Sequence, residues 1–262
     1  MRKYALFEAG LRTGFVYRLH YFATLLSAPI SLLIYFYLWS SIYAYSNATI
    51  IQGFTFEEII SYYVLAMIVG FVTWSSCDNQ IEEGVVDGDT IIALLKPFSF
   101  MAWHYFFELG FNGLALVIEL VPVFVVGLLF GLKMATAFNI LLFIIAIVLA
   151  MFLYFLITFL VGLTSFWLFK IGGLRRVKRT LLAFLGGSML PLTFFPESVQ
   201  KVFIFLPFQY LRYVPVNIYL DKYTMVQSLG LLAIALIWVL ILYGIALLVW
   251  RSAFKKFAGA GT

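Results

Sequence analysis

The sequence predicts an all-α, polytopic membrane protein with six membrane-spanning helices. Of its 262 residues, 64% are hydrophobic and only 11% are charged, whereas about a quarter of the residues of a soluble domain are charged. Its mean hydropathy is +1.05. Several runs without a charged residue reach the ~20 residues that a helix needs to cross a bilayer. We therefore expect residues 1–262 to form a single transmembrane domain.

Six apolar segments are expected to be the spans, and the polar stretches between them to be the loops. The fifth segment has only about sixteen residues and contains Pro191, so it is barely long enough to cross. The six segments are residues 21–45, 56–76, 101–130, 135–169, 180–195 and 223–250.

Residues 1–20 are expected to form an amphipathic helix ahead of the first span. Tyr4, Phe7, Leu11 and Phe15 recur at near-helical spacing among four cations. Such a helix lies along a membrane surface with its cations at the lipid headgroups.

Residues 77–100 are the one long polar interruption of the apolar sequence. Five of the twelve acidic residues lie here, and an apolar stretch follows from Thr90 to Leu95. Asp89 or Thr90 can cap a short helix there, and Pro97 disfavours helical geometry at the residue before it. A helix of about two turns is not stable alone in water, so its apolar side chains need a surface to pack on. The alternative, a solvated acidic connection, leaves these side chains exposed.

Two further segments interrupt the apolar pattern. Residues 170–179 carry five cations and no acid, which is typical of a loop anchored at the cytoplasmic face. Residues 196–222 are apolar and aromatic but contain Pro207, Pro215 and scattered charged residues, so no uninterrupted spanning helix fits there. We expect short re-entrant helices that dip partway into the membrane and are held against protein.

The distribution of cations predicts the orientation. Thirteen of the 17 lysines and arginines fall in residues 1–20, 77–100, 170–179 and 251–262, which six spans place on one side. Cytoplasmic loops are the ones rich in Lys and Arg, so both termini and both polar loops are expected in the cytoplasm. Orientation thus accounts for the net charge of +5 without a nucleic-acid partner.

Motifs for catalysis or for ATP binding are absent from the sequence. Nothing matches the GxxxxGK[ST] loop that holds nucleotide phosphates, so this chain does not bind ATP by that route. If transport is driven by ATP, another polypeptide must bind the nucleotide. One cysteine and two histidines leave no disulfide framework, CxxC motif or His-rich metal site. Asp87 and Asp89 have the spacing of a metal-binding DxD pair of a transferase, but no diphosphate clamp accompanies them.

Two stretches carry a resemblance to a known family. One is IEEGVVDGDTIIALLKP at residues 81–97, and the other is LTFFPESVQKVFIFLPFQYLRYVP at residues 192–215. With the basic lead, the six spans and the basic turn before the fifth, nearly the whole chain resembles the permease subunit of an ABC-2 type (exporter) ATP-binding cassette transporter. The resemblance implies a coupling helix between residues 82 and 96, and re-entrant outer helices at residues 196–214.

The resemblance also implies the partners and the location. Two ATPase subunits would bind ATP and Mg, while this chain would hold no cofactor and would not itself be an enzyme. A second permease subunit, identical or similar, would complete the substrate cavity. The complex would reside in a prokaryotic cytoplasmic membrane and contact its lipids. The residues expected to dock on the ATPase are Glu82, Glu83, Asp87, Asp89, Ile91, Ile92, Leu94, Leu95 and Lys96.

The third span carries the only well-embedded carboxylates, Glu108 and Glu119, with Asn112 on the same stripe. Eleven residues are three turns, so on a straight helix the two carboxylates lie within about 20° of one face and roughly 16 Å apart. One interpretation is a polar track facing the substrate cavity, in which Glu119 attracts a cationic substrate or relays a proton. The other is a structural hydrogen bond to a neighbouring helix, which is the expected role of Glu108.

The expected function is therefore an ATP-driven exporter permease for a hydrophobic or amphipathic substrate, with a cationic one suited to Glu119. Two other classes remain. An ATP-independent transporter or channel would use Glu108, Asn112 and Glu119 as its pathway. A membrane-embedded lipid-modifying enzyme is disfavoured, because the sequence offers no Ser/His pair, zinc motif or multi-acid site.

Overall fold

The structure is a computed structural model, and it describes residues 7–9, 11–13, 18–90 and 99–259. Apart from an isolated bridge between Ile51 and Phe54, the regular structure in these ranges is helical. The helices are α2 (Arg18–Ser46), α3 (Phe56–Thr73), α4 (Cys77–Val86), α6 (Phe100–Leu129), α7 (Ala137–Leu163), α8 (Ser165–Leu168), α9 (Gly172–Leu185), α10 (Glu197–Ile204), α11 (Tyr213–Tyr219) and α12 (Met225–Gly259), with 3₁₀ turns η1 (Leu192–Phe194) and η2 (Pro207–Leu211).

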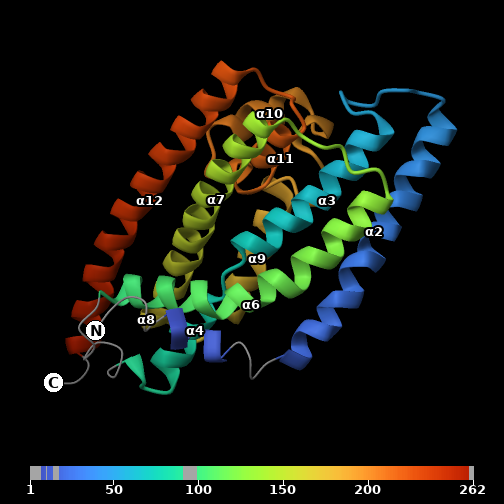
Figure 1. The fold of residues 1–262 in the computed structure, drawn as a ribbon. Helices are drawn as coiled ribbons and strands as arrows, with labels where there is room; N and C mark the ends of the chain where they lie inside the picture. The colour runs from blue at the N-terminus through green and yellow to red at the C-terminus, as the bar shows by residue number, and fades with distance from the viewer. Residues whose placement is uncertain (1–6, 10, 14–17, 91–98, 260–262) are drawn as a thin grey trace.

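The long helices run between two ends of the molecule. In Figure 1, α4, α8 and the C-terminal end of α12 lie at one end, and α10 lies at the other. The C-terminal end of α12 therefore lies at the same end as α4, as expected if the polar segment after the second span and the C-terminus share one side of the membrane.

Four helical stretches in the described ranges are long and apolar enough to cross a membrane: Ser27–Ser46, Phe56–Val86, Ala137–Leu168 and Met225–Lys256. The pair Phe100–Gly113 and Ile118–Leu129 makes a fifth candidate if the bent α6 is one span. An all-helical membrane protein is thus confirmed, and these candidates correspond to the first, second, third, fourth and sixth expected spans.

The fifth expected span takes a different form. Its helix, α9, begins at Gly172, within the basic segment that the sequence predicted to be a loop, and it has 14 residues. It ends at Leu185 because Gly187 follows with a φ of +79°, a conformation that favours glycine. Pro191 therefore lies outside the helix, and the six-span count remains a prediction.

Local sequence signals set several helix starts. Thr55 and Glu58 form a reciprocal capping box at the start of α3. The hydroxyls of Ser99 and Thr136 accept backbone N–H groups at the starts of α6 and α7. As a result, α3, α6 and α7 begin within two residues of the predicted starts of the second, third and fourth spans.

The two halves of α6 differ in direction by 54°. The first half lies across the end of the molecule that contains α4, and the second half rises beside α2 (Figure 1). The carbonyl of Phe7 lies against Gly110 in the first half, where an added Cβ would be 1.9 Å from the carbonyl oxygen. Most of the N-terminal lead predicted at residues 1–20 lies outside the described residues.

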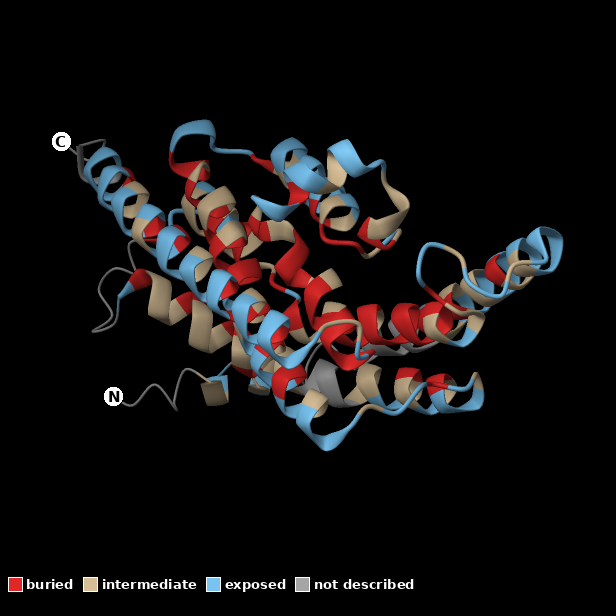
Figure 2. Cartoon of the chain, turned by 90° about the horizontal axis from the view of Figure 1, so that it is seen from above, coloured by how far each residue is buried: buried red, intermediate tan, exposed pale blue. Residues whose placement is uncertain are grey.

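The core has two clusters joined by α7. One gathers residues of α4, α7, α12 and the η2–α11 segment, and the other gathers residues of α2, α3 and the second half of α6. Figure 2 shows the buried residues at the centre and exposed residues along the outer faces. The outer faces are apolar, since Leu240 and Leu248 of α12 are 62% and 65% exposed. Lipid can cover such faces, whereas water could not do so without cost.

Residues 196–222 are built from α10, η2 and α11, with no helix longer than eight residues. Pro207 begins η2, and the buried α11 packs against α7 and α3. This agrees with the expected proline-broken segment of short helices. Their re-entrant placement in a membrane remains a prediction.

Candidate functional site

Helix α4 lies against α7, with its first turns buried. Cys77, Asp78 and Ile81 are buried, and Gly162 of α7 makes the close approach. A Cβ added at Gly162 would be 2.9 Å from the Cα of Asp78 and 2.8 Å from Cδ1 of Ile81. The absence of a side chain at Gly162 thus lets α4 pack directly on the backbone of α7.

A buried ion pair joins α4 to α9. The ammonium of Lys178 lies 2.6 Å from a carboxylate oxygen of Asp78, and it also donates to the hydroxyl of Thr158 in α7. Both charged side chains are almost fully buried. Burial lowers the pKa of Lys178, and the hydrogen bond to Asp78 opposes that shift. Three helices therefore meet at one ammonium group.

Glu82 extends the same junction by one turn of α4. One of its carboxylate oxygens pairs with Arg175 of α9, and the other accepts the backbone N–H of Ile171 at 3.0 Å. Since Ile171 precedes the first residue of α9, the carboxylate also stabilises the positive end of that helix. Arg175 lies 3.7 Å from Asp78 as well, so two acids of α4 share the cations of α9.

The distal end of α4 is free of this junction and exposed. Glu83 accepts only the amide of Asn79 within α4, and Val86 is 46% exposed. Asp87 and Asp89 follow as exposed residues around Gly88, whose φ is +83°. The structure thus separates Glu82, which is bound within the chain, from Glu83, Asp87 and Asp89, which are accessible. Five predicted docking residues lie outside the described residues: Ile91, Ile92, Leu94, Leu95 and Lys96.

Sequence reasoning missed the pairing of the acidic segment with the basic one. The signal that could have found it is the opposite charge of two segments predicted on the same side of the membrane. Matching them residue by residue needs the helical form of residues 172–179, which belong to α9 and which the sequence predicts as part of a loop.

Glu108 of α6 lies against the break between α3 and α4. Its carboxylate accepts the Ser75 hydroxyl at 2.5 Å, the Ser76 backbone N–H at 2.6 Å and the Ser76 hydroxyl at 3.2 Å. The side chain is buried. These bonds satisfy the backbone where the span breaks between α3 and α4, which is the structural role expected for Glu108.

Asn112 and Glu119 are placed differently from Glu108. Asn112 donates to the carbonyl of Trp74 at 2.9 Å, and with Glu108 it lines a cavity of about 30 Å³ between α3, α6 and α7. Glu119 lies beyond the bend of α6 and is not among the residues lining that cavity. The straight-helix geometry that placed the three on one stripe therefore does not describe α6.

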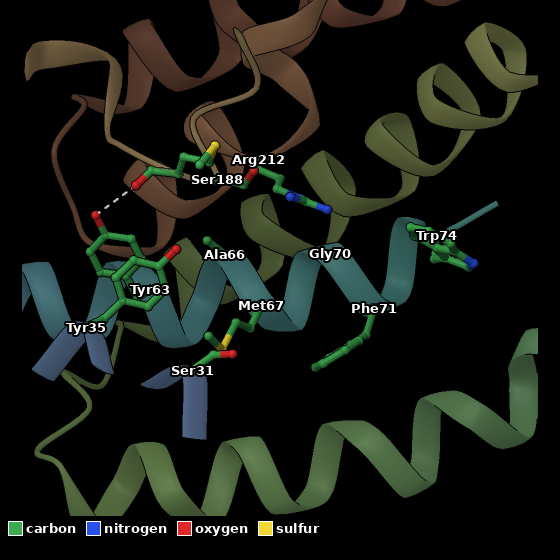
Figure 3. Close-up of a pocket in the computed structure, with 11 residues that line it drawn as sticks. Ser31, Tyr35, Tyr63, Ala66, Met67, Gly70, Phe71, Trp74, Ser188 and Arg212 are labelled. Atoms are coloured by element: carbon green, nitrogen blue, oxygen red, sulfur yellow. Dashed lines mark hydrogen bonds between the residues drawn. The ribbon is translucent and has the colours of Figure 1, made fainter. Parts of the chain in front are cut away.

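A larger cavity lies between α2, α3 and the segments that follow α9. Its volume is about 360 Å³, and Figure 3 shows it along one side of α3. Two tyrosines fix its wall: the hydroxyl of Tyr62 donates to Gly187 and that of Tyr63 donates to Met189. Arg212 is the charged residue among those that line the cavity, and sequence reasoning did not single it out.

These features define a class of protein. The chain has apolar spanning helices, a cavity among them, and a helix at one end that is ion-paired to the body and has an accessible acidic tip. This is the organisation of a multi-pass membrane transport protein rather than that of a soluble enzyme.

Comparison with protein families identifies the class more closely. The family model described as ABC-2 family transporter protein matches residues 24–261, and the chain therefore belongs to that family. The resemblance inferred from residues 81–97 and 192–215 is thereby confirmed, and the chain is a membrane permease of ABC transport. Comparisons with curated proteins and with solved structures found no match.

Proposed function

We propose that this chain is the permease subunit of an ABC exporter, driven by a separate ATPase that docks on the segment from Glu83 to Lys96. Two permease subunits, identical or similar, would enclose the pathway, and two ATPase subunits would bind ATP and Mg. The substrate would be hydrophobic or amphipathic and would leave toward the outside. The chain would reside in a prokaryotic cytoplasmic membrane with both termini in the cytoplasm.

The observation that carries this proposal is the two-part character of α4. Its first half is bound to the body by the Asp78–Lys178 pair, the Glu82–Arg175 pair and the contact at Gly162. The stretch from Glu83 to Asp89, which runs from the last turn of α4 past its end, is acidic, and its three carboxylates are exposed. A partner with basic side chains would be attracted to this end, and its push would pass to α9 through the ion pairs and to α7 through the contact at Gly162.

The ATP-independent alternative has less support. Its pathway needs Glu108 and Asn112 to be available to an ion or a substrate, but both already have hydrogen-bond partners in the chain. The cavity of about 30 Å³ that they share has room for only about two or three water molecules, because one water needs roughly 10–15 Å³ of such volume.

Site-specific photo-cross-linking tests the docking surface. A photoreactive amino acid is placed at Asp87, the protein is irradiated in membranes of the source organism, and the cross-linked partner is identified by mass spectrometry. The expected partner is a soluble-domain ATPase with a nucleotide-binding motif. The matched control places the same probe at Phe205 after α10, which is 76% exposed at the opposite end of the molecule.

Substitution of Leu94 and Leu95 by Asp in the same protein should abolish the cross-link at Asp87 while leaving membrane insertion intact. A charged side chain cannot pack into an apolar groove without a large desolvation cost. An ATPase that cross-links equally well from Phe205, or that still cross-links to the Leu94→Asp, Leu95→Asp variant, would contradict the docking assignment.

A further inference from the structure

The cavity between α2 and α3 combines an apolar wall with one cation. Tyr35, Tyr63, Phe71 and Trp74 provide aromatic surface, and Met67 and Met189 add flexible apolar surface. Besides the polar atoms of these aromatic side chains, the polar lining residues are the serines at 31 and 188 and Arg212. A volume of about 360 Å³ is within the range of pockets that hold small organic molecules.

The guanidinium of Arg212 lies against the backbone of α3 at Gly70. A Cβ added at Gly70 would be 3.0 Å from Nη2 and 3.2 Å from Cζ of Arg212. Figure 3 shows the Arg212 side chain extended along α3 beside Gly70, with its nitrogens toward the end of the helix that carries Trp74. Glycine at this position therefore makes room for the charged group within the cavity.

This cation lies beside the last turn of α3. Gly70 is three positions before Thr73, the last residue of α3, which is about 4.5 Å along a helix, and it lies within the candidate span Phe56–Val86. Arginine keeps its charge at any physiological pH, and an ionisable group within a spanning segment is costly unless it is paired.

No Asp or Glu side chain pairs with Arg212. All twelve Asp and Glu side chains lie in the described part of the chain, and the ion pairs found there involve other cations. The ionisable groups that influence Arg212 are the phenols of Tyr154, Tyr62 and Tyr35, which are neutral at physiological pH. The charge of Arg212 is therefore available to an anion from outside the described chain.

We propose that this cavity binds the substrate and that Arg212 holds its anionic group, a carboxylate or a phosphate carried on an apolar body. The planar guanidinium donates in parallel to two oxygens of such a group. The inference rests on the proposed transport function and narrows its substrate class from amphipathic molecules to amphipathic anions. It also differs from the cationic substrate that Glu119 would favour.

Binding of short amphiphiles to the purified full chain in a neutral detergent tests this assignment without any ATPase. The probes are octyl phosphate, octanoate and octyltrimethylammonium, with the dissociation constant measured by microscale thermophoresis. The anions are expected to bind and the cation is expected to bind at least tenfold more weakly. Arg212→Met should weaken octyl phosphate about tenfold or more, whereas Lys201→Met, which removes an exposed cation of α10, should leave it unchanged.

A second variant keeps the test decisive if Arg212→Met fails to fold. Gly70→Leu retains the charge but places a side chain where the guanidinium now lies, so it should also weaken octyl phosphate. Equal binding of octyl phosphate by the wild type and a folded Gly70→Leu or Arg212→Met variant would overturn the proposal, and so would preferred binding of octyltrimethylammonium.

The source of the anionic group is found by competition in nanodiscs. If phosphatidylglycerol displaces octyl phosphate from the wild type, the occupant is an anionic membrane lipid. If phosphatidylglycerol and phosphatidylcholine behave alike while octyl phosphate still binds through Arg212, the occupant is a free amphiphile. If the Asp87 cross-link fails while octyl phosphate still binds through Arg212, the ATPase docking alone is rejected. If the cross-link forms while octyl phosphate does not bind through Arg212, the substrate class alone is rejected.

Discussion

The ammonium of Lys178 in α9 lies 2.6 Å from a carboxylate oxygen of Asp78 in α4, and both side chains are buried. The two residues are one hundred positions apart in the sequence. Their pairing makes the first turns of α4 a part of the body, so the surface offered to a motor protein begins beyond these turns, at Glu83.

Breaking this pair should destabilise the protein strongly. Asp78→Asn leaves the buried ammonium of Lys178 without its carboxylate, a loss of about 3–5 kcal/mol, and Lys178→Met should cost less because Arg175 still lies 3.7 Å from Asp78. The melting temperature of the purified protein in detergent measures this effect. The double variant should lose much less than the sum of the two, because it removes both charges.

The Glu8–Arg12 pair is the comparison for the Asp78 and Lys178 variants, because both of its side chains are exposed and lie four residues apart. Glu8→Gln should change stability by about 0.5 kcal/mol or less. A cost for Asp78→Asn as small as that for Glu8→Gln would show that the buried pair does not hold α4 in place.

Gly162→Ala should push α4 away from α7. The added Cβ would overlap the Cα of Asp78, which is backbone and cannot move aside as a flexible side chain can. We expect a loss of about 1–3 kcal/mol, read from the melting temperature, together with reduced ATP-driven transport. Gly173→Ala is the matched control, because a Cβ there meets nothing within 4 Å and should have almost no effect. Unchanged stability of Gly162→Ala would contradict the close approach of α4.

Glu108→Gln should cost stability and leave substrate selectivity unchanged. The amide that replaces one carboxylate oxygen cannot accept from all three serine groups, so about 1–3 kcal/mol is expected to be lost. Glu119→Gln, for which the described structure gives no such set of bonds, is expected to be milder. If Glu108→Gln instead kept the melting temperature and altered transport of cationic substrates, Glu108 would belong to the pathway.

Glu58 should hold together the helix ends that lie opposite α4. Its carboxylate pairs with Lys133, at 3.1 Å, and with Lys222, and it also caps α3 through Thr55. Glu58→Gln should lower stability by about 1–2 kcal/mol, measured by thermal melting in detergent. The neighbouring Glu57→Gln, at an exposed position, is the control and should change stability little. Equal effects of the two would show that the Glu58 network does not contribute.

The apolar runs and the caps between them were enough to predict most of the helices. A run of about 20 apolar residues has few alternatives to a spanning helix, because its backbone must satisfy its own hydrogen bonds in lipid. The same argument is wrong for α9, because its basic first half predicts a loop. In the structure Asp78 and Glu82 of α4 pair with Lys178 and Arg175 of this helix, and no local pattern records that contact.

The sequence by itself determined an all-helical membrane protein, since hydropathy and charge distribution act locally along the chain, and the resemblance carried by residues 81–97 and 192–215 pointed to a permease. Only the tertiary structure decided which charges are available to partners. In the structure, Asp78 and Glu82 pair with cations of α9, and Glu108 accepts hydrogen bonds from the serines that follow α3. Arg212 lines a cavity that has no carboxylate among its lining residues. The physical reason is that the cost of a charge in a membrane depends on what lies within a few ångströms of it in space, and these neighbours come from segments far apart in the chain.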